Sequence, residues 1–183
     1  MKYPTRDLSN RTDILFALIK EFIEDKASFL DIGCGHPEAF QGTGLPLLIH
    51  NGFPNVKYFG IDIEKKAIEN CRRDYPFFDW LCCDASKYRA VKDADFVIHT
   101  GFNRWWDKSW KLHKRLAPKF VLLETGVPLT VGHSEHHQVY EKVREIYSKK
   151  AYVEIQKGTY IWSADVNQQL RFFTVLKKES KND

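Results

Sequence analysis

The fold is decided by one short stretch, Phe29-Leu30-Asp31-Ile32-Gly33-Cys34-Gly35. Its apolar residues predict a buried strand over 28–32, and its two glycines predict a tight turn directly afterwards. Neither glycine carries a Cβ, so the backbone of the turn can come close to a ligand. In an open α/β sheet, ligands bind outside the carboxyl ends of the strands, where this turn would lie. The stretch therefore predicts a strand of an α/β sheet with a ligand site at its end.

Outside this stretch, short apolar runs alternate with segments of helical periodicity, which is typical of βαβ units and a mostly parallel sheet. We expect strands over 28–32, 56–62, 78–83, 95–99 and 119–124, and helices over 8–25, 64–73, 105–116 and 139–147. Two further β-rich runs, 152–162 and 170–177, have only a turn between them, so they must pair as a hairpin. The sequence thus predicts an α/β fold with a seven-stranded, mostly parallel sheet and one antiparallel strand near the C-terminus.

The composition indicates one globular domain. The chain has 183 residues, 43% of them apolar and 28% charged, without an internal repeat or a linker. No apolar run approaches the roughly 20 residues of a membrane-spanning helix, and the first residues lack a signal-peptide pattern, so we expect a cytoplasmic protein without a membrane partner. The four cysteines form no C-x-x-C pair, so we expect reduced thiols. The net charge of +4 is mild and the basic residues are scattered, so a nucleic-acid partner is possible but not favoured.

Three aspartates stand where successive strands end. Asp31 lies in the first strand, two residues before the glycine turn, whereas Asp62 ends the second strand and Asp84 ends the third. Because the carboxyl ends of parallel strands share one edge of a sheet, we expect these carboxylates at one ligand site. A carboxylate one strand away from the turn can accept hydrogen bonds from two ribose hydroxyls. A third carboxylate farther along can bind the exocyclic amine of an adenine.

With these residues in order, the sequence resembles the class I S-adenosylmethionine-dependent methyltransferases. The resemblance rests on Phe29 to Gly35, on Gly60-Ile61-Asp62-Ile63 and on Cys82-Cys83-Asp84-Ala85, and it extends to the terminal hairpin. It implies a Rossmann-like three-layer sandwich formed by a single domain over 1–183, with a helix or lid over 1–26 and the core over 27–183.

The resemblance also implies the cofactor, S-adenosylmethionine, and the residues that bind it. The segment from Asp31 to Gly35 is expected to hold the amino-acid end, Asp62 the ribose, and Asp84 with the adjacent backbone the adenine. The expected cofactor-binding residues are Asp31, Gly33, Cys34, Gly35, Asp62, Ile63, Cys83, Asp84, Ala85 and Thr100.

The segment after the glycine turn departs from the family pattern. Gly35 and Asp62 are 27 positions apart, about six or seven more than is common in the family, and short loops are the norm between strands and helices. We interpret the extra residues as an insertion near the methionine end of the cofactor, where His36 or Phe40 would face the substrate.

Two other interpretations remain open. A nicotinamide dehydrogenase would show G-x-G-x-x-G, but Glu38 stands where the third glycine is required after Gly33 and Gly35. A carboxylate just before the turn would also repel a pyrophosphate. A cofactor-binding module without catalysis keeps the same fold, since fold alone does not establish function.

The candidate catalytic residues are His99, which ends the fourth strand, and Glu124, which ends the fifth. His99 could act as a general base, or hydrogen bonds could simply hold it beside the cofactor. Phe102 and Trp105 are candidates for a substrate pocket, and so is His133. Ser134 resembles a helix N-cap, which would leave His136 and His137 solvated, so we predict no metal site.

Methyl transfer requires chiefly that the acceptor be aligned with the methyl group. The N/D-P-P-Y/F string of base amino-group methylases is missing after the fourth strand, as is the Pro-Cys nucleophile of cytosine-C5 enzymes. We therefore expect a small-molecule acceptor. An RNA or protein methyltransferase is the alternative, and the pattern does not indicate an oligomeric state.

Overall fold

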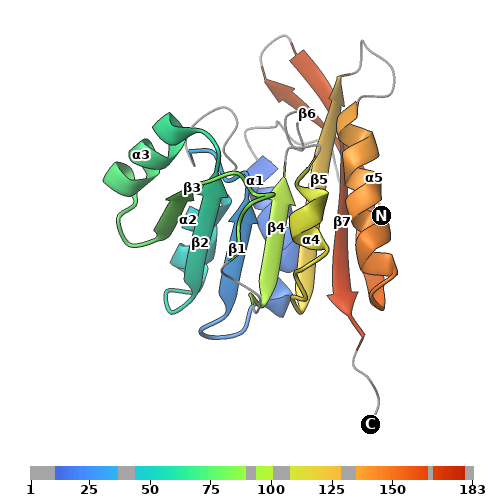
Figure 1. Cartoon of the computed structure of the whole chain (residues 1–183), viewed down its shortest axis with the longest axis horizontal. Coiled ribbons are helices and arrows are strands. Elements are labelled where there is room, and N and C mark those ends of the chain that lie inside the picture. Colours follow the sequence, from blue (N-terminus) through green and yellow to red (C-terminus); the bar gives the residue numbers. More distant parts are fainter. Residues whose placement is uncertain are drawn as a thin grey trace.

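A seven-stranded sheet forms the centre of the protein (Figure 1). The structure is a computed structural model that describes residues 11–36, 44–89, 94–100, 108–128, 135–164 and 167–179. The strand order is β3-β2-β1-β4-β5-β7-β6. The strands are β1 (Ser28–Ile32), β2 (Lys57–Asp62), β3 (Asp79–Cys82), β4 (Phe96–Thr100), β5 (Phe120–Pro128), β6 (Tyr152–Ala164) and β7 (Asn167–Lys178). Strands β1 to β5 are parallel, and β7 lies antiparallel between β5 and β6, so the predicted sheet is confirmed.

The strand order reverses beside β1. The chain runs from β1 outward through β2 to β3 and then returns to place β4 against the other side of β1. In the β1–β4 ladder, Ile32 pairs with His99. The carboxyl ends of β1 and β4 therefore form the topological switch point where open α/β sheets bind ligands.

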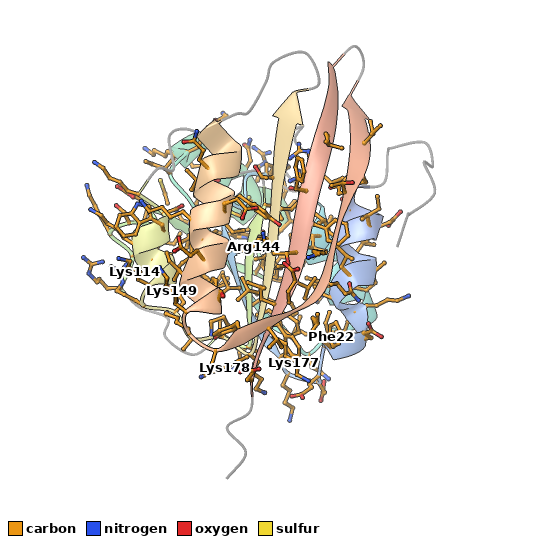
Figure 2. The ribbon with its side chains drawn as sticks, turned by 90° about the vertical axis from the view of Figure 1, so that its right-hand side faces the viewer. Phe22, Lys114, Arg144, Lys149, Lys177 and Lys178 are labelled. Carbon is orange, nitrogen blue, oxygen red and sulfur yellow. The ribbon has the colours of Figure 1, made fainter. Side chains whose placement is uncertain are left out.

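Helices cover both faces of the sheet. Figure 2, seen from the β6 edge, shows α5 on one face and α1 on the other. Residues of α1, α2 and α3 pack into one apolar cluster, whereas residues of the α4 segment and of α5 pack against the opposite face. The helices are α1 (Arg11–Ile19), which continues as a 3₁₀ turn (Lys20–Phe22), α2 (Leu45–Gly52), α3 (Lys65–Asp74), α4 (Trp110–His113) and α5 (Glu135–Ser148).

The central strands are apolar on both faces, as a covered parallel sheet requires. Every residue of β4 is buried, and in β1 only Ser28 is partly exposed. Phe29 stacks on Phe96 with ring centroids 4.6 Å apart, and Phe96 stacks on Phe120 at 5.0 Å. This aromatic row fixes the relative positions of β1, β4 and β5 below the switch point.

Three helical segments differ from the sequence prediction. The helix expected over 8–25 is shorter, because α1 ends at Ile19 and a 3₁₀ turn follows it. Of the helix expected over 105–116, the described part shows only α4, and 101–107 lie outside the described residues. Helix α2 was not predicted, although it begins with a proline in its first turn after Gly44, whose φ is 64°. No helix in the described ranges has the length and apolar character to cross a membrane.

We predict that Gly60→Ala destabilises the protein by about 1–3 kcal/mol because it overpacks the core. A Cβ at this position would lie 2.5 Å from the ring of Trp80 and 3.0 Å from Sγ of Cys34. The indole cannot easily move, because its Nε1 donates a 2.9 Å hydrogen bond to the carbonyl oxygen of Tyr75. Urea denaturation measures the change.

The matched control is Gly52→Ala, whose Cβ would meet only the tip of Phe16 at 3.3 Å. Because alanine is favoured over glycine in a helix, this variant should keep wild-type stability within about 1 kcal/mol. Equal effects of the two substitutions would contradict the packing argument.

Candidate functional site

The glycine turn after β1 is fixed to the end of β2 by its backbone. The amide groups of Gly33 and Cys34 both donate to the carbonyl oxygen of Ile61, at 2.8 and 3.1 Å. Gly33 and Gly35 have φ angles of 74° and 56°, in the left-handed region that favours glycine. The thiol of Cys71 donates to the carbonyl oxygen of Gly35 at 3.2 Å. The turn is thus held from β2 and from α3.

Asp62, the last residue of β2, connects this turn to the next loop. Its Oδ2 accepts a 2.9 Å hydrogen bond from the amide of Gly35, and its Oδ1 accepts a 2.8 Å bond from the amide of Glu64. The residue is buried. Each carboxylate oxygen has a second lone pair, so Asp62 can also accept hydrogen bonds from a pair of ligand hydroxyls.

Asp31 is a buried carboxyl group with one oxygen still available. The hydroxyl of Tyr58 donates to its Oδ2 at 2.5 Å, whereas its Oδ1 is buried and has no hydrogen-bond partner among the described residues. Burial raises the pKa of Asp31 to about 7, and the neighbouring Asp62 raises it too, against the opposing effects of Tyr58 and Arg11. A buried acceptor without a donor is costly, and a cationic donor from a ligand would satisfy it.

Asp84 follows β3 at the same edge of the sheet. Its Oδ1 accepts a 2.8 Å hydrogen bond from the amide of Ser86, and the hydrogen bonding of Ser86 keeps the pKa of Asp84 below its usual value. The amide of Cys83 donates to the carbonyl oxygen of Asp62 at 2.8 Å, which ties this loop to β2. Ala85 is buried, whereas Ile63 is 58% exposed and offers an apolar surface beside the two carboxylates.

His99 lies in a buried chain of hydrogen bonds on the α4–α5 face. Its Nδ1 is 2.9 Å from Nε2 of His113, and Nδ1 of His113 is 3.0 Å from the hydroxyl of Tyr147. Burial lowers the pKa of His99 well below its usual value, and the pKa of His113 falls to about 3 for the same reason. A general base works best with a pKa near the working pH, so this environment favours a structural role for His99 over proton transfer.

Glu124 is the centre of a buried ionic cluster on the α1 face. Arg11 donates to both of its carboxylate oxygens, at 3.1 and 2.7 Å, and the hydroxyl of Tyr160 donates to it at 2.7 Å. Arg171 lies 3.4 Å away. Although burial opposes ionisation, the two guanidinium groups and the hydrogen bonds hold the pKa of Glu124 at about 2. Such a strongly paired carboxylate is a poor base, so its contacts favour a structural role.

Of the remaining predicted site residues, Thr100 and His36 are described by the structure, and the others are not. Thr100 is buried at the end of β4, in register with Glu124. His36 comes directly after the glycine turn, but its Nε2 lies 3.1 Å from Oδ2 of Asp74 at the end of α3. The predicted substrate residues Phe102, Trp105 and His133 lie outside the described residues, as do Phe40 and the first ten residues of the helix or lid expected over 1–26.

Sequence reasoning missed Tyr58 as a residue of this site. In the β1–β2 ladder Tyr58 pairs with Phe29, so Asp31 is its diagonal neighbour on the same face. The sequence did contain an indication of this contact. Tyr58 stands in an apolar strand, where its hydroxyl would be buried, and a buried hydroxyl needs a hydrogen-bond partner. Among the described residues, no group of three or more histidine, cysteine, aspartate or glutamate side chains is arranged to hold a metal ion.

Comparison with solved structures shows which proteins share this fold. The chain matches precorrin-6y C5,15-methyltransferase from Geobacter metallireducens with a TM-score of 0.64 and 12% identity, over 92% of this chain and 86% of that one. It matches magnesium protoporphyrin IX methyltransferase from Synechocystis, solved with bound S-adenosylmethionine, with a TM-score of 0.61 and 13% identity, over 91% and 77%. It also matches the N-methyltransferase NodS from Bradyrhizobium japonicum, in complex with S-adenosylhomocysteine, with a TM-score of 0.63 and 13% identity, over 94% and 87%.

These similarities establish the fold: the chain folds as S-adenosylmethionine-dependent methyltransferases do, in the Rossmann-like sandwich that the sequence predicted. A scan against protein-family models gave no match, and a search of curated protein sequences gave none either.

We predict that Asp31→Asn stabilises the protein at pH 8. The pKa of Asp31, about 7, lies above its ordinary value of 3.8, so the folded protein binds more protons than the unfolded chain between these values. The free energy of unfolding therefore falls as the pH rises from about 4 to 7, by up to about 4 kcal/mol. Asparagine avoids this cost and still accepts a hydrogen bond from Tyr58.

Denaturant unfolding at pH 8 and pH 4.5 measures this effect. The variant should exceed the wild type by a few kcal/mol at pH 8, and the difference should shrink at pH 4.5, where Asp31 is protonated. A difference independent of pH would show that the buried charge is not its source.

We predict that Glu124→Gln lowers the free energy of unfolding by about 3–5 kcal/mol, because it leaves two buried guanidinium groups without their carboxylate. The control is Glu145→Gln, which removes an exposed carboxylate 2.5 Å from Lys149 and should cost at most about 1 kcal/mol. Urea denaturation at pH 7 compares the two. If Glu124→Gln unfolds like the wild type, the cluster is not what holds α1 to the sheet.

Proposed function

We propose that the chain is a methyltransferase that uses S-adenosylmethionine and acts on a small molecule. The observation that carries this proposal is the buried Oδ1 of Asp31, which has no partner among the described residues and lies in the strand that leads into the double-glycine turn. An ammonium group is a donor of the right charge for this position. The methionine part of S-adenosylmethionine carries one.

The other residues of the site fit the same cofactor. Asp62 would accept hydrogen bonds from the two ribose hydroxyls, since both of its oxygens have lone pairs beyond those used by Gly35 and Glu64. Asp84 would accept a hydrogen bond from the exocyclic amine of adenine, and the exposed Ile63 would cover a face of the base. When bound, the cofactor supplies an activated methyl group on a sulfonium sulfur.

A nicotinamide cofactor suits the site less well. In dinucleotide-binding folds the glycine turn receives a pyrophosphate. Here the turn is flanked by Asp31 and by Asp62, whose carboxylate accepts a hydrogen bond from the amide of Gly35 that an anion would need. The buried carboxyl group of Asp31, in the strand that leads into the turn, favours a cationic ligand over a dianionic one.

For the chemical step, we propose that alignment of the acceptor matters more than proton removal. His99 has a pKa well below its usual value and Glu124 has one of about 2, so neither group is suited to act as a base near neutral pH. We propose that both hold the walls of the site, and that Thr100, His36, Phe102, Trp105 and His133 border the acceptor.

A small-molecule acceptor is supported by two of the structural neighbours, the methyltransferases of precorrin-6y and of magnesium protoporphyrin IX. RNA or protein is the second candidate, and it is favoured by a group of positively charged lysine side chains around Trp110. Three lysine ammonium groups surround the ring of Trp110, those of Lys114 and Lys142 at 4.5 and 4.2 Å from its centroid. Figure 2 shows Lys114 and Lys149 along the outer side of the α5 layer.

Calorimetric titration of S-adenosylmethionine, S-adenosylhomocysteine and NAD tests the cofactor. We expect micromolar binding of the two sulfur ligands, no binding of NAD, and a loss of about ten- to a hundredfold in Asp62→Ala, which lacks the acceptor for the ribose. The control is Asp79→Ala, which removes an exposed carboxylate at the opposite end of β3. Binding of NAD in preference to both sulfur ligands would overturn the proposal.

A further inference from the structure

Tyr58 holds Asp31 in one orientation. Its hydroxyl donates to Oδ2 of Asp31 at 2.5 Å from the neighbouring strand. Its ring is buried and packs against Phe29, Phe78 and Trp80, with centroids 6.0, 5.2 and 6.0 Å away. Because the ring is packed on several sides, the hydroxyl cannot turn away from the carboxyl group. Of the two carboxyl oxygens, Oδ1 is therefore the one that remains for a ligand.

The groups around Asp31 have opposing effects on its ionisation. Burial and the carboxylate of Asp62 favour the protonated form, whereas Tyr58 and Arg11 favour the carboxylate. The thiol of Cys34 is also close and is itself buried, with a raised pKa. With the pKa of Asp31 at about 7, both forms are populated near neutral pH. Since Oδ2 accepts the Tyr58 hydrogen bond, the proton of the neutral form belongs on Oδ1.

We propose that Tyr58 is a positioning residue that directs Oδ1 of Asp31 toward the ammonium group of the cofactor, so that cofactor binding displaces the proton of Asp31 into solvent. The O–H bond at Oδ1 breaks, the proton goes to water or buffer, and an N–H group of the ligand takes its place. No electron is exchanged, and the pair that forms is a carboxylate with an ammonium. This inference rests on the proposed function.

Titration of S-adenosylhomocysteine from pH 5.5 to 7.5 tests the displacement, because the ligand amine stays largely protonated in this window. The dissociation constant should fall about twentyfold as Asp31 ionises with a pKa near 7. Calorimetry at pH 6.5 in two buffers of different ionisation enthalpy should show release of about three quarters of a proton. Asp31→Asn should release none.

Tyr58→Phe separates positioning from simple packing. Loss of the hydroxyl removes a donor that favours the carboxylate, so the pH at which binding strengthens should rise by about one unit. Affinity should then be roughly eightfold weaker at pH 6.5, and the loss should shrink toward pH 7.5. The control is Tyr152→Phe, whose hydroxyl donates to the carbonyl oxygen of Pro118, and which should leave the pH profile unchanged.

The outcomes distinguish this inference from the function it rests on. If S-adenosylhomocysteine does not bind at pH 7.5, the proposed function fails. If it binds without proton release, or if Tyr58→Phe weakens binding equally at every pH, only the role of Tyr58 and Asp31 is overturned. 5′-Methylthioadenosine, which has no ammonium group, should bind without releasing a proton. Should Tyr58→Phe not fold, the wild type compared with Asp31→Asn still decides whether cofactor binding displaces a proton from Asp31, and equal proton release by the two would overturn the proposal.

Discussion

The two hydrogen bonds from the glycine turn to the carbonyl oxygen of Ile61 fix the positions of the other candidate cofactor residues. They join the end of β1 to the end of β2 at the point where the strand order reverses. From there Asp62 continues the connection, since it accepts hydrogen bonds from the turn and from the loop that follows β2. The backbone thus holds these loops before any ligand binds, which reduces the entropy that binding would cost.

Two buried carboxyl groups of this fold, those of Glu124 and Asp31, have surroundings that shift their pKa values in opposite directions. Glu124 has two guanidinium groups and a tyrosine hydroxyl around it, and it stays ionised. Asp31 has one tyrosine hydroxyl and a repelling carboxylate, and its ionisation is opposed. The first arrangement stabilises the packing of α1 on the sheet. The second leaves a buried group incompletely satisfied at the switch point, which is typical of sites where function is favoured over stability.

The sequence was sufficient to predict features that depend on local pattern. The apolar runs around Phe29 and Val121 gave the strands, and the glycines with Asp62 and Asp84 placed the candidate site at the carboxyl edge. The sequence pattern could not predict contacts between residues that are far apart in the chain. Arg11 and Glu124 are 113 positions apart and meet only because α1 packs across β5, and Tyr58 reaches Asp31 only through the register of β1 with β2. Helix α2 was missed because its residues fall between Gly35 and Asp62, in the segment whose extra length the sequence analysis interprets as an insertion.

The strand order also determines how late during synthesis the sheet can form completely. Strand β5 is paired on one side with β4 and on the other with β7, which follows β5 in the chain only after α5 and β6. Until β7 has left the ribosome, β5 presents an unpaired edge, and Glu124 on that strand lacks the Arg171 that β7 supplies. Arg11 precedes Glu124 by 113 positions, and Arg171 follows Glu124 by 47, so the ionic cluster can close only after all three have been synthesised. Such a late, non-local closure slows folding and leaves the nascent chain dependent on protection of its open edge.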